Sequence, residues 1–150
     1  MPSKRLRNYF QDYASYHQTP GNRLTHYFGI PFIVISLLGL LSLITFGLDI
    51  SANSEYFRID GGVVLIALAF PIYFFIDWKI TPPFILLICG FYFLGRALPT
   101  PINWTLFIGG WILQGLGHAK YEKKSPAFFK NFTHLLIGPL WIFSKLIGYK

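Results

Sequence analysis

The apolar residues of the chain gather in long stretches that contain no charged residue. The first stretch covers residues 28–48, and about 20 residues are enough for a helix to cross a hydrocarbon core about 30 Å thick. Residues 61–76 and 80–95 are shorter and flank a polar turn at residues 77–79. This pattern predicts one transmembrane helix followed by a helical hairpin that turns at a membrane interface.

Two further apolar stretches lie in the second half of the chain. Residues 97–117 are uncharged, but Pro99 and Pro101 disfavour helix at the start, so we expect the fourth crossing helix to run over residues 102–121. Residues 131–144 are too few for a crossing and contain a central Gly-Pro pair. That length predicts a re-entrant or interfacial helical segment at the C-terminal end.

The N-terminal segment has a different pattern. Residues 5–18 contain no Pro or Gly, and at helical spacing their apolar and aromatic residues fall on one face. The residues on this face are Leu6, Tyr9, Phe10, Tyr13, Tyr16 and His17. We expect a helix that lies at the membrane interface, followed by a second helix that Asn22 is placed to cap.

Composition supports a membrane protein. Hydrophobic residues make up 53% of the chain and charged residues only 13%, against a soluble average of roughly 25% charged. Nothing in the composition marks a second domain. The predicted fold is therefore one all-α integral membrane domain over residues 1–150, with about four transmembrane helices, an interfacial N-terminal helix and the C-terminal segment described above.

The basic residues predict the orientation. Four crossings place eleven of the 13 Lys and Arg residues on one side and leave only Arg58 and Arg96 on the other. Because cytoplasmic loops carry the excess of Lys and Arg, both termini are expected in the cytoplasm, in either a bacterial inner membrane or the endoplasmic reticulum. The net charge of +7 then reflects contact with lipid headgroups, and nucleic acid is not an expected partner.

The same topology brings all four histidines to the cytoplasmic face, where they can build a metal site. His17 and His26 lie before and at the start of the first span, and His118 lies at the end of the fourth. His134 follows several phenylalanines in the C-terminal segment, where it is either a further ligand or a packing residue. Each of these histidines taken alone can equally be an interfacial side chain.

Gln114, His118 and Glu122 are spaced four residues apart and so share one stripe of a helix. A histidine and a carboxylate at this spacing can offer a nitrogen and an oxygen to one ion, although Glu122 can also form only a surface ion pair. The sequence contains no glycine-rich phosphate loop and no nucleophile elbow, and Cys89 is its single cysteine. Hydrolysis without a metal is therefore not expected.

These residues resemble those of a known family, the 2-hydroxy fatty acid dioxygenases that act in phytosphingosine degradation. The first block of the resemblance is Tyr16-His17, Asn22, His26 and residues 29–31. The second block is Gln114, Gly117-His118, Glu122 and residues 126–127. The spacing within the blocks and the four-span layout also agree, so the resemblance covers nearly the whole chain.

The resemblance implies an Fe²⁺-dependent enzyme that uses O₂ to shorten a long-chain 2-hydroxy fatty acid by one carbon, which is α-oxidation. It implies His17, His26 and His118 as iron ligands, and Glu122 as a ligand or as a residue that orients one. Gln114 and Asn22 would then support the ligands or donate hydrogen bonds to the substrate. The alternatives are another metal-dependent lipid hydrolase or hydroxylase, and a non-catalytic protein that binds lipid.

Overall fold

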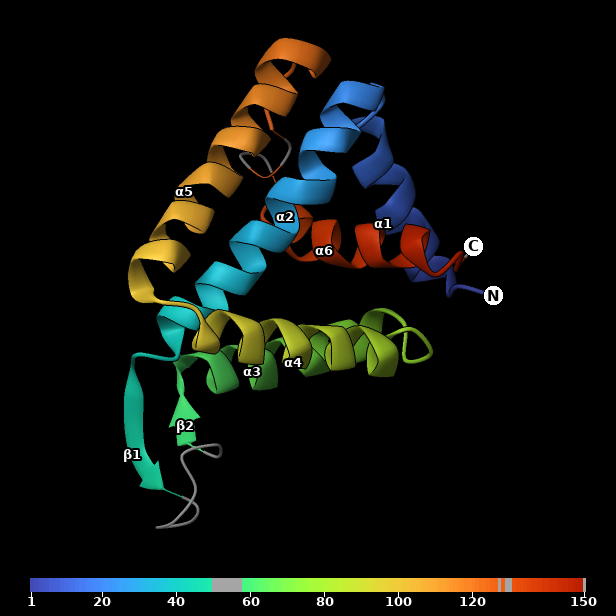
Figure 1. Ribbon diagram of the computed structural model, residues 1–150. Coiled ribbons are helices and arrows are strands. Elements are labelled where there is room, and N and C mark those ends of the chain that lie inside the picture. Colours follow the sequence, from blue (N-terminus) through green and yellow to red (C-terminus); the bar gives the residue numbers. More distant parts are fainter. Residues whose placement is uncertain (50–57, 127, 129–130, 150) are drawn as a thin grey trace.

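A computed structural model gives the fold of the chain and describes residues 1–49, 58–126, 128 and 131–149. These residues are mainly helical (Figure 1). The elements in chain order are α1 (Lys4–Ser15), α2 (Pro20–Leu41), β1 (Thr45–Asp49), β2 (Arg58–Asp60), α3 (Gly61–Ile76), α4 (Thr81–Ala97), α5 (Thr100–Leu116), the π-helix η1 (Gly117–Glu122) and α6 (Thr133–Leu146). The predicted all-helical class is confirmed, and one short two-stranded sheet is an addition that the sequence pattern did not predict.

Helix α2 is the central element and contacts α3, α4, α5, η1 and α6. It begins at Pro20, because the Thr19 hydroxyl accepts a hydrogen bond from the backbone N–H of Asn22 and proline suits the first helical position. The prediction that Asn22 caps this helix is therefore wrong, since Asn22 lies inside the first turn. Thr19 and Asn22 are both good capping residues, and the proline directly after Thr19 decides between them.

The first apolar stretch is also only partly helical. Helix α2 ends at Leu41, and Thr45–Asp49 form strand β1, which pairs antiparallel with β2 through Thr45 opposite Asp60 and Asp49 opposite Arg58. The predicted continuation of the helix to residue 48 is therefore wrong. An uncharged apolar run does not distinguish helix from strand, and pairing with β2 supplies the hydrogen bonds that a further helical turn would have made.

Glycines allow α2 to lie very close to two neighbouring helices. A Cβ atom at Gly29 would be 3.0 Å from the carbonyl oxygen of Gly110 on α5, and a Cβ at Gly39 would collide with the carbonyl of Gly95 on α4. The absent side chains let the backbones touch, as in tightly packed membrane helices. Any larger residue at Gly39 would push α4 away from α2.

The predicted helical hairpin is confirmed as the helices α3 and α4, joined by a turn that begins at Asp77. The Asp77 carboxylate accepts hydrogen bonds from the backbone N–H groups of Ser3 at 2.6 Å and Lys79 at 3.0 Å. The hydroxyl of Tyr149 lies 3.4 Å from the same carboxylate. Asp77 therefore joins the turn to both ends of the chain, which lie side by side (Figure 1).

The fourth predicted helix starts slightly early and changes its winding. Helix α5 begins at Thr100 and accommodates Pro101 in its first turn, where a missing N–H costs nothing. At Gly117 the α-helix passes into the π-helix η1, which ends at Glu122 and is followed by Lys123 with a left-handed φ of 54°. The prediction of one regular α-helix to residue 121 is therefore wrong in the type of helix over the last residues. The helical segment itself extends to residue 122.

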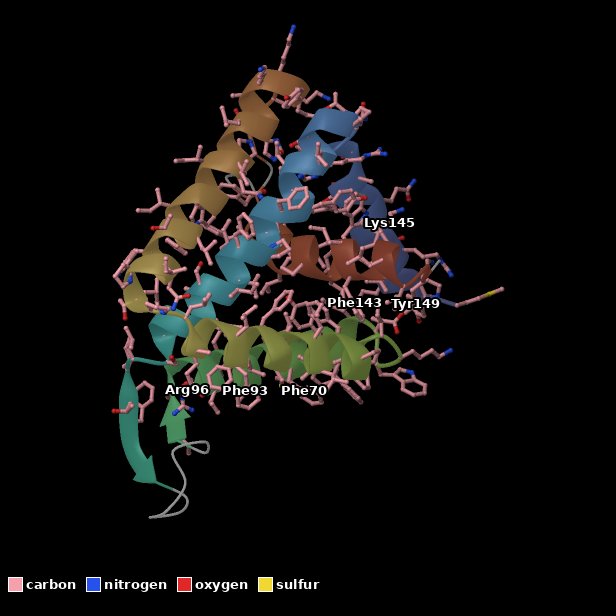
Figure 2. All side chains as sticks on the ribbon, viewed as in Figure 1. Phe70, Phe93, Arg96, Phe143, Lys145 and Tyr149 are labelled. Atoms are coloured by element: carbon pink, nitrogen blue, oxygen red, sulfur yellow. The ribbon has the colours of Figure 1, made fainter. Side chains whose placement is uncertain are left out.

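The C-terminal segment is a continuous helix, α6, which contains Pro139 and packs against α1. Its buried residues, including Leu140 and Trp141, join Leu6 and Tyr13 of α1 and Phe84 of α4 in the main hydrophobic core. Figure 2 shows Phe143 between α6 and the α3–α4 hairpin, whereas Phe70 and Phe93 point away from this core. The expected helix in this segment is confirmed and continues through Gly138 and Pro139, and the re-entrant or interfacial position of the segment stays a prediction.

Among the described helices, α2 is the one whose length and apolarity suffice for a bilayer crossing, and α3 and α4 are shorter apolar helices. Many large apolar side chains on α3, α4 and α5 are nevertheless exposed. Leu68 is 64% exposed, Leu86 75% and Ile108 55%. Figure 1 shows the α3–α4 hairpin lying across the lower end of the α2–α5 pair.

Candidate metal centre

Three of the four histidines meet at one point. His17 follows α1, His26 lies in the second turn of α2, and His118 lies on η1. Their ring centroids are 4.5, 5.0 and 4.9 Å apart, and the rings stand nearly perpendicular to one another. The three side chains are buried, and each offers a ligand nitrogen within 4.8 Å of the others. The sequence prediction that these residues come together is thus correct.

Backbone carbonyls fix the orientation of two of the rings. Nδ1 of His17 donates to the carbonyl oxygen of Tyr13 at 2.7 Å, and Nδ1 of His26 donates to the carbonyl oxygen of Asn22 at 2.8 Å. Because a carbonyl can only accept, Nδ1 carries the proton in both rings and Nε2 keeps its lone pair. This is the arrangement in which proteins hold a metal-binding imidazole.

His17 is further held by the ring of Tyr13, which stacks on it with centroids 4.0 Å apart. Tyr13 therefore supports His17 through both its carbonyl and its ring, a role that the sequence analysis did not assign. Burial lowers the pKa of His17 from 6.5 to about 4, so its imidazole is neutral near neutral pH. A neutral imidazole needs to lose no proton before it binds a metal.

The third histidine has no such support. Nδ1 of His118 is buried and has no hydrogen-bond partner among the described residues. A buried polar atom without a partner costs free energy, and this nitrogen is free to bind a metal ion or a water molecule. The donor set of three neutral imidazoles suits a divalent transition metal.

Helix α2 and the α5–η1 segment run antiparallel and form three side-by-side pairs. The pairs are Gln114 with Gly29, His118 with His26, and Glu122 with Asn22. Gln114, His118 and Glu122 therefore share the face of the helix toward α2, as their four-residue spacing predicted, and all three are buried. Gly117 is required in this packing, because a Cβ there would lie 2.5 Å from Oδ1 of Asn22.

Glu122 lies beside the histidine cluster but is not part of it. Its carboxylate accepts hydrogen bonds from the backbone N–H of Gln18 at 3.0 Å, and from the N–H and hydroxyl of Thr19 at 3.1 and 3.0 Å. Nδ2 of Asn22 adds a fourth bond at 3.1 Å. Of the two expected roles, ligand or orienting residue, this geometry favours the second.

These donors also set the charge of Glu122. Burial raises the pKa of its carboxyl, but the hydrogen bonds from Gln18, Thr19 and Asn22 outweigh burial and hold the pKa at about 2. Glu122 is therefore ionised at any physiological pH. It joins η1 to the loop between α1 and α2, and so brings His118 to the other two histidines.

Asn22 and Gln114, the two amides expected near the site, are both there. Besides its bond to Glu122, Asn22 donates to the carbonyl of Tyr16 at 3.3 Å, and its own carbonyl holds His26. Oδ1 of Asn22 and Nε2 of Gln114 are buried and find no partner in the part of the chain that the structure describes. Gln114 also lines the cavity next to the histidines, which gives it an unused polar group close to the site.

His134 lies outside the three-histidine group. Its Nε2 is 2.8 Å from Oδ2 of Asp12, and its ring contacts those of Tyr13 and Tyr16. Asp12 is a partner that sequence analysis missed. The available signal was that Asp12 is the only acidic residue before Asp49.

A cavity of about 260 Å³ opens from the histidine cluster. His17, His26, His118 and Gln114 lie on its wall, and most of the remaining lining residues are aliphatic or aromatic. No Lys, Arg, Asp or Glu is among these lining residues. The site is thus a group of polar atoms at the wall of an apolar chamber.

Fold and site together define a helical protein with a buried histidine cluster that can hold a metal ion beside an apolar cavity. The family model described as 2-hydroxy-palmitic acid dioxygenase Mpo1-like matches residues 3–149. The chain belongs to this family, which confirms the resemblance found in the sequence. No curated protein and no solved structure matches the chain at a significant level.

Proposed function

We propose that the protein is an Fe²⁺-dependent dioxygenase that shortens 2-hydroxy fatty acids by one carbon. The observation that carries the proposal is the cluster of His17, His26 and His118 on the wall of an apolar cavity. Membership in a family named for a 2-hydroxy-palmitic acid dioxygenase supports the same reaction. The overall change is R–CH(OH)–COOH + O₂ → R–COOH + CO₂ + H₂O, in which the bond between the carboxyl carbon and its neighbour breaks.

His17, His26 and His118 would hold the iron, and the backbone carbonyls of Tyr13 and Asn22 keep the first two imidazoles in the correct tautomer. When bound, Fe²⁺ would supply redox chemistry toward O₂ and open positions for the oxygens of the substrate. Glu122 takes no part in the reaction itself and holds His118 in place through its loop contacts.

The cavity would bind the rest of the substrate. Its apolar lining excludes water and suits a hydrocarbon chain, while the unpartnered Nε2 of Gln114 is available to donate a hydrogen bond to the carboxylate. A 2-hydroxy acid carries a second oxygen beside the carboxylate, so its head group can be fixed at two points. An unsubstituted acid can be fixed only at one.

We further propose that the protein is an integral membrane protein with four crossings and cytoplasmic termini. Support comes from the apolar α2, from the exposed apolar side chains of α3, α4 and α5, and from the two chain ends lying together. An exposed apolar surface of this extent is unfavourable in water and favourable in lipid. A membrane location also supplies the fatty acid substrate directly.

The test is O₂ consumption by the purified protein loaded with Fe²⁺. We expect turnover of 2-hydroxyhexadecanoic acid and a rate lower by a factor on the order of 10⁴ with hexadecanoic acid, because a buried polar contact is then left unpaired. The protein loaded with Zn²⁺ should be inactive, since zinc has no redox chemistry. Equal rates with both acids would refute the proposal, and so would O₂ consumption at the full rate by the Zn²⁺-loaded protein.

A further inference from the structure

We propose that the cavity is the binding site of the acyl chain and that Leu65 and Ile88 limit the length of chain it accepts. This inference rests on the proposed function and adds the part of the protein that selects the substrate by length. It places the hydrocarbon chain inside the protein rather than in the surrounding lipid.

One face of α2 forms a continuous wall of the cavity. The residues on it are His26, Ile30, Ile33, Val34, Leu37 and Leu38, which recur every three or four residues. From His26 to Leu38 the helix rises about 18 Å at roughly 1.5 Å per residue. One leaflet of a bilayer, which a lipid acyl chain spans, has a hydrocarbon thickness of about 15 Å. The wall is thus long enough for one fatty acid chain that starts at the histidines.

The opposite walls come from the α3–α4 hairpin and from α6. Leu65 and Ala69 of α3 line the cavity together with Ile85 and Ile88 of α4, and α6 adds residues such as Leu136. Among the lining residues of α3 and α4, Tyr73 is the polar one, and its hydroxyl is occupied by a hydrogen bond to the carbonyl of Leu136 at 2.8 Å. The part of an occupant that lies against the α3–α4 hairpin therefore meets no free polar group of these two helices and has to be apolar.

The end of the cavity lies where α3 and α4 meet α2 at Leu38. A Cβ at Gly62 of α3 would be 3.1 Å from the carbonyl oxygen of Leu38 and 2.9 Å from the ring of Tyr92. Tyr92 is buried and donates a hydrogen bond to the carboxylate of Asp60 at 2.7 Å, and it is not among the lining residues. The bonded Tyr92–Asp60 pair therefore closes the space behind Leu38.

Leu65 and Ile88 are the lining residues next to this closure. Leu65 lies three residues after Gly62 on α3, and Ile88 lies four residues before Tyr92 on α4, so each is about one helical turn from the closed end. Both side chains line the cavity and are only partly buried by other protein atoms. They are placed to contact the terminal methylene groups of a long chain and to leave a short chain untouched.

The test compares 2-hydroxyoctanoic, 2-hydroxydodecanoic and 2-hydroxyhexadecanoic acids in the wild type and in Leu65→Phe and Ile88→Phe. Each methylene group that loses its place in the cavity should lower kcat/KM about fourfold, from about 0.8 kcal/mol per buried CH₂. Loss of two such groups predicts about a fifteenfold fall for the longest acid, with little change for the shortest. Ile88→Ala should shift the preference toward longer chains.

Leu86→Phe is the matched control, because Leu86 lies on the same helix two residues from Ile88 and is 75% exposed. It should leave the length preference unchanged. Displacement of bound cis-parinaric acid by the same three acids gives a second readout that needs no turnover. If a phenylalanine variant fails to fold, Ile88→Ala gives the same comparison of chain lengths in both assays.

The outcomes separate the two proposals. Length preferences that shift in the Leu65 and Ile88 variants and not in Leu86→Phe support the inference. Equal effects on all three acids in both readouts would overturn it, even if the dioxygenase activity stands. If no 2-hydroxy acid is turned over but the displacement series shifts as expected, the acyl-chain site stands and the proposed reaction fails.

Discussion

The role of Glu122 as the residue that joins η1 to the α1–α2 loop can be tested by Glu122→Gln. The substitution keeps the size of the side chain, removes its charge and replaces one acceptor oxygen by an NH₂ group. The N–H of Gln18, or the donors of Thr19 and Asn22, would then face a donor instead of an acceptor. The remaining hydrogen bonds would be formed with a neutral oxygen.

The magnitude follows from this hydrogen-bond set. Leaving one buried donor unsatisfied costs roughly 1–3 kcal/mol, and a hydrogen bond to a neutral acceptor contributes about half as much as one to a charged acceptor. Because these effects are not additive, we expect a loss of about 2–4 kcal/mol in the free energy of unfolding. Metal affinity should fall by roughly 10–100-fold, since His118 loses its fixed position.

Unfolding in detergent followed by circular dichroism gives the stability, and a Co²⁺ titration followed by visible absorption gives the affinity. Lys124→Gln is the matched control, because it changes the charge of an exposed residue two positions away. The control should behave as the wild type does. If Glu122→Gln had wild-type stability and bound Co²⁺ as tightly as the wild type, the proposed role of Glu122 would be wrong.

Three further predictions concern the surroundings of the site. His134→Ala should reduce stability by about 1–3 kcal/mol but leave metal content unchanged, because His134 is bonded to α1 and lies outside the three-histidine group; loss of metal would make it a ligand. The free energy of unfolding of the metal-free protein should fall as pH falls from 6.5 to about 4, because His17 binds a proton in the unfolded chain but not in the folded protein. An unchanged dependence of this free energy on pH in His17→Gln would contradict the prediction. In a cysteine-free background, Lys4→Cys and Lys145→Cys should react with an impermeant reagent from the cytoplasmic side only; opposite accessibility would mean an odd number of crossings.

Much of the site could be predicted from the sequence, because it depends on residue spacing. The four-residue interval from Gln114 to His118 and Glu122 places all three side chains toward α2, and the structure has them there. His17 and His26 lie far from His118 in the sequence, and only the predicted four crossings placed all three on one face of the membrane. The side of the membrane on which each histidine lies depends on the order of the helices and not on their detailed packing.

The remaining features depend on contacts between distant segments and have no local signal. Glu122 could be read as a ligand because nothing in the sequence shows that the N–H groups of Gln18 and Thr19 lie around its carboxylate. The change from α- to π-helix occurs at Gly117, which is packed against α2, a contact between segments far apart in the sequence. The end of α2 at Leu41 depends on pairing with β2, which lies after the intervening loop.

The proposed activity requires that His17, His26 and His118 bind one metal ion together. Iron content after anaerobic loading with Fe²⁺ measures this in the wild type and in the His17→Ala, His26→Ala and His118→Ala variants, with circular dichroism as the check on folding. We expect a stoichiometric amount of iron in the wild type and almost none in each variant, because a small site cannot replace a lost ligand. A folded variant that retained the wild-type amount of iron would exclude its histidine as a required ligand and contradict the three-histidine centre.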